Sequence, residues 1–134
     1  PQLGPLQVLE ETFSSQGFKV LAFYSNNFGS QGGSNDQIDA CTKLHGVTFP
    51  QFAIANVIEP DIQPVWGWLL AQPNPRPEVA LAPTWNFHKY LISRDGTLVQ
   101  HFLQGEWPGD DPNNPNDSFE TSAIVMAIEA ELAQ

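Results

Sequence analysis

The stretch FKVLAFY, residues 18–24, is apolar at nearly every position and decides the fold class. It is too short for a separate buried helix, which favours a strand. Continuous apolar strands of this kind are covered on both faces, as in sheets that are flanked by helices. We therefore expect Phe18–Tyr24 to be a buried strand between two layers of helices.

Helical patterns lie on both sides of this strand. After it comes a polar, glycine-rich loop at residues 25–33. Ser34 and Gln37 then form a capping-box signature that opens a helix running to about Leu44. Before the strand, apolar residues recur at helical spacing as far as Gly17, which ends that helix. These apolar residues are Leu3, Leu6, Leu9 and Phe13.

The second half of the chain begins with a strand and a short helix and contains the clearest turn. Phe52–Val57 is a second short strand candidate, and Pro64–Leu70 has the pattern of a short helix. Tyr90–Ser93 and Thr97–Leu103 flank Asp95-Gly96, the strongest short-range signal for a β-hairpin. The sequence therefore predicts a strand, a helix and a hairpin in this order.

Two loops and a final helix complete the predicted organisation. Residues 72–77, QPNPRP, form a proline-rich surface loop, and residues 105–117, GEWPGDDPNNPND, form an acidic loop rich in turn formers. Asp117 and Glu120 make a second capping box. The order of elements indicates an α/β sandwich around a mixed central sheet, in one domain that spans residues 1–134. The apolar stripe of the last helix consists of Ile124, Ile128 and Leu132.

The predicted sheet lacks a neighbour for its first strand. Phe18–Tyr24 needs partners at its edges, yet only a helix precedes it in the chain. We therefore expect a further strand upstream of Pro1. The chain also starts with proline rather than methionine, which agrees with a natural N-terminus farther upstream.

Composition and charge narrow the class of partner. Fifteen acidic residues against five basic ones give a formal net charge of −10. A surface this negative repels phosphate backbones and anionic membranes, which argues against nucleic acid as a partner. No apolar run approaches the roughly 18 residues that a membrane span needs. Small neutral substrates, or partners with basic patches, fit this charge better.

Four separated stretches carry a more specific signal. They are PQL (Pro1–Leu3), GFKVLAFYSNNFGSQGGSN (Gly17–Asn35), CTKLHGVTFPQF (Cys41–Phe52) and WNFHKYLISRDGTLV (Trp85–Val99). In their order and spacing they resemble the glutathione peroxidase family, from the first residue to about Phe102. The resemblance implies a thioredoxin-like α/β fold and the reduction of hydroperoxides through a cysteine or selenocysteine.

Three residues match the groups that surround the reactive sulfur in this family. The resemblance implies that they are Gln31, Trp85 and Asn86. Their side chains offer neutral hydrogen-bond donors. Donors of this kind stabilise a thiolate, which is the nucleophilic form of the sulfur, and thereby lower its pKa. We expect the trio to hold the sulfur and to orient a peroxide for attack.

The nucleophile itself is expected outside the given chain. In the family it lies in a C-G-x-T-P-Q-Y turn, and Pro1-Gln2 match the P-Q of that turn, which places it about four residues before Pro1. The resemblance thus implies a chain that is truncated at its N-terminus, without the peroxidatic cysteine and the strand that leads into it.

Two interpretations of Cys41, the only cysteine, stay open. The resemblance implies a resolving cysteine, whose thiolate attacks the sulfenic acid and forms a disulfide that thioredoxin reduces. A buried structural cysteine at a helix end is the alternative. No cofactor is implied beyond a thiol reductant as co-substrate, either thioredoxin or glutathione. A resolving role would favour thioredoxin.

The loop after the first strand departs from the family pattern. Where the family has PCNQFG, this chain has YSNNFG, so that Tyr24, Ser25 and Asn27 replace a proline, a cysteine and a glutamine. QEPG becomes QGG, so that the loop carrying Gln31 is one residue shorter and lacks the acid. These changes bear on the geometry of the site more than on the fold.

The leading hypothesis is a thiol-dependent peroxidase that reduces hydrogen peroxide and organic hydroperoxides and protects against oxidative stress. A non-catalytic thioredoxin-fold binding module is the alternative, and the altered loop favours it. A thioredoxin-fold enzyme that exchanges disulfides is a third hypothesis, but that chemistry usually needs C-x-x-C. The short connection at residues 63–84 lacks room for a long oligomerisation insert, which favours a monomer.

The three histidines suggest no metal centre. His45, His88 and His101 show no spacing that would put two of them on one helix face. We interpret all three as structural or surface residues.

Overall fold

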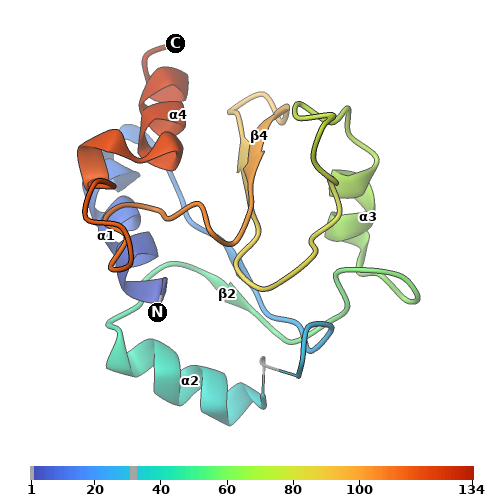
Figure 1. Ribbon diagram of the computed structural model, residues 1–134. Coiled ribbons are helices and arrows are strands. Elements are labelled where there is room, and N and C mark those ends of the chain that lie inside the picture. Colours follow the sequence, from blue (N-terminus) through green and yellow to red (C-terminus); the bar gives the residue numbers. More distant parts are fainter. Residues whose placement is uncertain (1, 31–32) are drawn as a thin grey trace.

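The computed structural model describes residues 2–30 and 33–134. Its elements follow the predicted order of helix, strand, helix, strand, helix, hairpin and helix (Figure 1). They are α1 (Leu3–Phe13), a 3-10 turn (Ser14–Gln16), β1 (Ala22–Phe23), α2 (Asn35–Leu44), β2 (Gln51–Phe52), α3 (Pro64–Leu70), β3 (Lys89–Ile92), β4 (Leu98–Phe102), a 3-10 turn (Phe119–Thr121) and α4 (Ala123–Leu132).

Local sequence signals account for most helix and turn boundaries. The capping box forms as predicted, because Ser34 accepts from the Gln37 backbone and the Gln37 side chain accepts from the Ser34 backbone. Pro64 occupies the first turn of α3, where its missing N–H costs nothing. Gly17 has a φ of 89° at the end of the first helical segment. Gly96 has a φ of 86° in the hairpin turn, a region that glycine enters without strain.

The last helix begins differently from the prediction. The capping box is made by Ser118 and Thr121, not by Asp117 and Glu120, and it opens the 3-10 turn at Phe119–Thr121. Ser122 then precedes α4. The predicted pair is displaced by one residue because the hydroxyl groups of Ser118 and Thr121 reach the backbone donors that a capping box must satisfy.

The strands form two separate pairs among the described residues, instead of one mixed sheet. β1 pairs in parallel with β2, and β3 pairs in antiparallel fashion with β4. Tyr90 lies opposite His101, and a register shift follows at Leu91/Ile92. No strand joins β1 to β3 in the part of the chain that the structure describes.

The first two strands are much shorter than predicted. Phe18–Tyr24 yields only Ala22–Phe23 as strand, and Phe52–Val57 yields only Gln51–Phe52. Leu21, expected to be buried, is 51% exposed. Strand assignment requires a hydrogen-bonded neighbour, and β1 has one on a single edge over two residues. The prediction of a buried strand over Phe18–Tyr24 is therefore confirmed only for Ala22–Phe23, because the described residues supply no second neighbouring strand.

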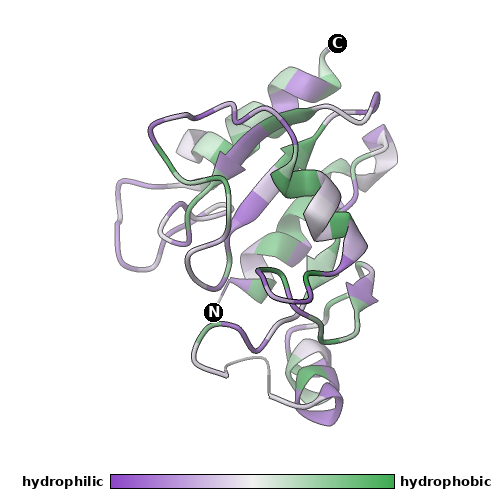
Figure 2. Ribbon diagram, turned by 90° about the vertical axis from the view of Figure 1, so that its right-hand side faces the viewer, coloured by the Kyte–Doolittle hydropathy of each residue, from purple (hydrophilic) through white to green (hydrophobic). Residues whose placement is uncertain are grey.

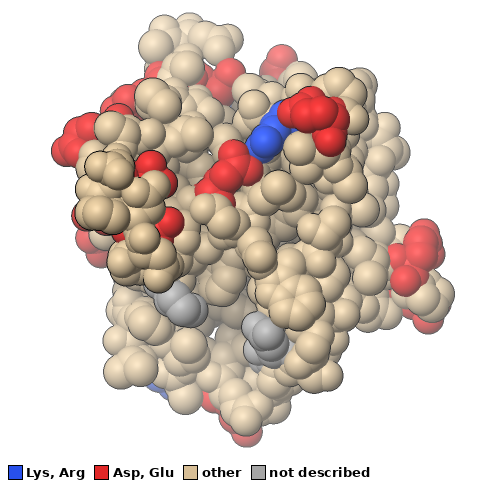
Figure 3. Space-filling model, in the orientation of Figure 1, with Lys and Arg blue, Asp and Glu red and all other residues tan. Residues whose placement is uncertain are grey.

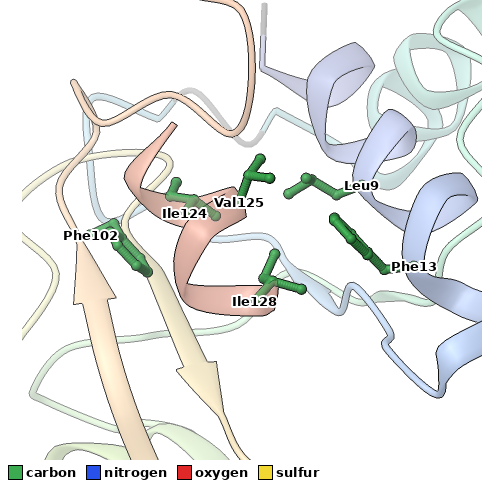
Figure 4. Packing of buried hydrophobic residues seen from close by; sticks show 6 residues of the cluster. All are labelled: Leu9, Phe13, Phe102, Ile124, Val125 and Ile128. Atoms are coloured by element: carbon green, nitrogen blue, oxygen red, sulfur yellow. The ribbon is translucent and has the colours of Figure 1, made fainter. Parts of the chain in front are cut away.

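The first hydrophobic core lies between α1, α4 and the hairpin. Val125 and Ile128 of α4 lie toward Leu9 and Phe13 of α1, while Ile124 lies on the side of Phe102 of β4 (Figure 4). Burial of each such side chain is worth about 1.5–3 kcal/mol. The three α4 residues are Ile124, Val125 and Ile128, each 5% exposed or less.

The second core lies on the side of the strands that α3 covers, and Figure 2 shows the molecule from this side. It contains Val57, Trp66, Leu69 and Leu98. The Trp66 ring contacts one aromatic ring from each strand pair, Phe23 of β1 at 6.0 Å and Tyr90 of β3 at 5.2 Å, both edge to face. Helices thus cover both faces of the strand layer, as an α/β sandwich requires, and Trp66 spans the two strand pairs.

Acidic side chains dominate the surface. Figure 3 shows carboxylates gathered over the loop that precedes α4, and basic side chains are sparse on the same face. This distribution agrees with the net charge of −10. Among the described residues, no helix has both the length and the apolar character that crossing a bilayer would demand.

Candidate functional site

The segment Trp85–Asn86 lies directly before β3 and carries two of the predicted site residues. The Trp85 side chain is 44% exposed, and Asn86 is half-buried. Phe87 follows with a φ of 56°, a left-handed conformation that costs a non-glycine residue about 1–3 kcal/mol. The surrounding structure must hold this turn in place.

The loop after β1 reaches the same place. The Phe28 ring packs against Trp85 with ring centroids 6.2 Å apart and a tilt of 47°. Phe28 also packs against the second core. The loop that leads to Gln31 is thereby brought to Trp85. Gln31 itself, the third predicted residue, lies outside the described residues.

The substituted residues of this loop stabilise it. The Asn27 carboxamide accepts from the Val57 backbone N–H at 2.9 Å and from the Ser25 hydroxyl at 2.6 Å, and donates to Asn56 at 3.2 Å. Ser25 and Asn27 are two of the three residues at which YSNNFG differs from the family pattern. Their hydrogen bonds tie the loop to the chain after β2, so the altered sequence still positions Phe28.

Cys41 lies on α2, far from Trp85–Asn86 in the sequence, and it is exposed. Burial raises the pKa of the Tyr24 phenol, and the negative charge of the nearby Cys41 thiolate adds to that effect. The Tyr24 hydroxyl donates to Gln51 at 3.1 Å. The structure thus places Cys41 beside the end of β1, on the surface of a helix. The alternative of a buried structural cysteine is wrong, because the side chain is accessible.

Two histidines, His88 and His101, lie close together next to the Trp85–Asn86 segment. From the sequence they were interpreted separately. His88 Nε2 and His101 Nδ1 are 3.0 Å apart, and His101 Nε2 is 3.0 Å from the Asn74 carboxamide oxygen. The His101 side chain is completely buried. The hairpin register could have revealed part of this grouping, since His101 must face Tyr90 across the two strands. Its contact with the proline-rich loop carries no sequence signal.

A partly exposed ionic cluster surrounds the end of the hairpin. Arg76 donates to the Glu106 carboxylate at 2.9 Å and to the His101 carbonyl at 3.0 Å. The Lys89 ammonium donates to three backbone carbonyls, among them that of Glu106 at 2.7 Å. Burial lowers the pKa of Lys89 to about 7, against the opposing effect of the Glu106 charge. These contacts fix the hairpin end and the turn after β4.

The described residues contain no group of three or more His, Cys, Asp or Glu side chains placed to hold a metal ion. The predicted site residues of this segment offer neutral donors. The Trp85 indole N–H and the Asn86 amide can both donate hydrogen bonds, and Trp85 is 44% exposed.

Comparison with known proteins gives a consistent assignment. The chain is 36% identical over 110 residues to a glutathione peroxidase homolog, BsaA, of Halalkalibacterium halodurans, covering 81% of this chain and 69% of that protein. It is 35% identical over 105 residues to the glutathione peroxidase-like peroxiredoxin gpx1 of Schizosaccharomyces pombe, covering 76% of this chain and 65% of that protein. The chain thus spans about two thirds of the length of these curated relatives.

The structural comparison agrees with the sequence comparison. The crystal structure of Trgpx in its apo form matches with a TM-score of 0.61 and 26% sequence identity, over 96% of this chain and 71% of that one. No protein-family model matches the chain. The sequence identity, the share of the relatives that is covered and the shared architecture together establish that this chain belongs to the glutathione peroxidase family.

Proposed function

We propose that the protein to which this chain belongs is a thiol-dependent peroxidase that reduces hydrogen peroxide and organic hydroperoxides. The observation that carries the proposal is the packing of Phe28 on Trp85, which brings two separated family motifs to one place. One motif leads to Gln31, and the other supplies Trp85 and Asn86. In a member of this family, that meeting point is the natural position for the reactive sulfur.

The chemical step follows from the donors at this place. A thiolate attacks the terminal oxygen of the hydroperoxide, the O–O bond breaks, and the leaving oxygen takes a proton and departs as water or an alcohol. The sulfur is oxidised to sulfenic acid. Trp85 and Asn86 would stabilise the thiolate through hydrogen bonds, which lowers its pKa and raises the population of the nucleophile. A thiol reductant, thioredoxin or glutathione, then returns the sulfur to its reduced state.

We propose further that the nucleophile and a central strand belong to a segment that precedes Pro1. Two observations support this proposal. β1 and β3 each have an unpaired edge among the described residues, while Trp66 packs on both strands. The Gln2 side chain is 6% exposed, and its oxygen has no hydrogen-bond partner, although its amide donates to Gln104 at 2.6 Å. A strand between β1 and β3 would satisfy the open edges.

Cys41 is proposed as the resolving cysteine. Its exposure on α2 leaves the thiol accessible to a sulfenic acid and to a protein reductant. Attack of the Cys41 thiolate on the sulfenic sulfur would form the disulfide and release the oxygen as water. Replacement of Cys41 by serine should then abolish turnover with thioredoxin and let the sulfenic acid accumulate, as a sulfenic-acid-specific reagent would detect. Unchanged thioredoxin-dependent turnover would assign the reductant to direct attack on the first sulfur.

The direct test is hydroperoxide consumption by the protein with its natural N-terminus. Trp85→Phe keeps the ring and removes the N–H, so kcat/KM should fall about tenfold to a hundredfold, the value of one hydrogen bond to a charged group. Trp68→Phe is the matched control, because Trp68 is also exposed, at 45%, but lies on α3. No consumption of peroxide with either reductant would favour a non-catalytic binding module.

A further inference from the structure

A partly buried chain of hydrogen bonds, with His101 fully buried at its centre, joins three segments of the molecule next to Trp85–Asn86. His88 stands just before β3, His101 lies on β4, and Asn74 belongs to the proline-rich loop. The two imidazole rings are stacked with centroids 5.3 Å apart and nearly parallel, at 9°. The Tyr90 ring lies parallel to the His88 ring within 14°, at 4.9 Å.

The direction of each hydrogen bond is fixed by Asn74. Its amide nitrogen donates to the Val79 carbonyl at 2.8 Å, and its oxygen accepts from the Arg76 backbone N–H at 2.9 Å. His101 Nε2 must therefore carry the proton and donate to that oxygen. His101 Nδ1 is then an acceptor, which requires His88 Nε2 to donate to it. His88 Nδ1 is left as a bare acceptor, and it is buried without a partner.

This arrangement has no place for an additional proton. A proton on His88 Nδ1 would create a buried N–H without an acceptor, and a proton on His101 Nδ1 would oppose the N–H of His88 across 3.0 Å. The charged groups that face the pair are Lys89 on β3, Arg76 and Glu78 in the proline-rich loop, and Glu106 after β4. The Glu106 carboxylate is already paired with Arg76, so its negative charge does little to stabilise an additional proton on the histidines.

We propose that His88 and His101 form an acid-sensitive latch, which holds the Trp85–Asn86 segment against the hairpin and the proline-rich loop while both rings are neutral. The latch opens when the pair gains a proton, because the added N–H either lacks an acceptor, on His88 Nδ1, or opposes the His88 N–H, on His101 Nδ1. Tyr90 keeps the hairpin side in place through its own bond to the Leu81 carbonyl at 2.6 Å.

The lowered pKa values of the two histidines agree with this acid sensitivity. Burial lowers the pKa of His88 from 6.5 to about 4, and the charges of His101 and Lys89 add to this effect. Burial and Arg76 also lower the pKa of His101. Because the folded pKa lies below the unfolded one, the closed latch is fully stable above about pH 6.5 and loses stability as the pH falls toward 4.

The test measures amide hydrogen exchange at pH 7 and pH 4.5, expressed as protection factors. Opening should grow about tenfold per pH unit below 6.5 for each proton taken up, so protection of residues 85–88 should fall about a hundredfold. The amides of α4 lie in the first core and should keep their protection. This readout does not depend on peroxidase activity, so its failure would leave the proposed function standing.

Two variants and one titration make the result decisive. His88→Gln keeps a donor toward His101 and removes the titrating ring, so the acid loss of protection should disappear. His45→Gln, at an exposed position on the end of α2, should leave the acid loss in place. If His88→Gln does not fold, NMR titration of the His88 ring in the unmodified protein decides instead. An ordinary pKa for His88, or equal acid loss in His88→Gln, would overturn the latch.

Discussion

The α1–α4 side and the β1–β2 side of this molecule are held together in different ways. On the first side, six buried apolar side chains pack from three elements into one cluster. On the second side, two residue pairs join β1 to β2, and their most intimate contact is the Phe23–Phe52 stack at 4.3 Å. Phe52 is 42% exposed. Further strands could bury the apolar residues of β1 and β2, but each of these strands pairs with only one other among the described residues.

The largest expected effect comes from a truncation in the first core. Phe13→Ala removes a ring that is 4% exposed and packs against Phe18 and Phe119, so it should lower the free energy of unfolding by about 3–5 kcal/mol. Phe52→Ala is the matched change on the second side and should cost less than about 1 kcal/mol. Chemical denaturation measures both. Equal losses would mean that the two sides do not differ as described.

A buried carboxylate provides the next largest effect. Glu10 is 5% exposed, accepts from the Val20 backbone N–H at 2.8 Å and pairs with Lys19 at 2.5 Å. Glu10→Ala leaves that N–H without its partner, which should cost about 1–3 kcal/mol. Lys19→Ala removes only a half-exposed ion-pair partner and should cost less than about 1 kcal/mol. If the lysine variant loses as much stability as the glutamate variant, the ion pair rather than the backbone contact holds residues 18–20 to α1.

The smallest expected effect concerns the start of α2. Ser34→Ala removes the acceptor for the Gln37 N–H, and loss of such a cap costs about 1 kcal/mol. The fall should appear as reduced helicity of residues 35–38 in NMR chemical shifts. Ser15→Ala, at an exposed position of the first 3-10 turn, is the control. Unchanged helicity of α2 in Ser34→Ala would show that packing, and not the Ser34 cap, holds the helix on which Cys41 lies.

The sequence predicted the elements that are defined by local chemistry. The helix of Leu3–Phe13, the Ser34–Gln37 cap and the Asp95-Gly96 hairpin all form, because spacing, capping and turn residues act over a few positions. The extent of the strands was predicted wrongly. A strand such as Phe18–Tyr24 takes its length from its neighbours, and its apolar composition does not show whether those neighbours are present.

The site was predicted from family motifs, and the structure adds the contacts that join them. Trp85 and Asn86 were identified from a motif, whereas the packing of Phe28 on Trp85 depends on tertiary structure. The chain of hydrogen bonds that joins His88, His101 and Asn74 was missed because Asn74 lies in a loop far away in sequence. Long-range polar contacts of this kind have no periodicity that a sequence reveals.

Amide hydrogen exchange of β1 and β3 tests most directly whether the two strand pairs are halves of one sheet. The measurement compares the 134-residue chain with the protein that includes the preceding segment. We expect protection of residues 18–24 and 89–92 to rise toward the level of α4 when the segment is present, because a central strand then pairs with both edges. Unchanged protection in both strands, with α4 equally protected in both proteins, would contradict it.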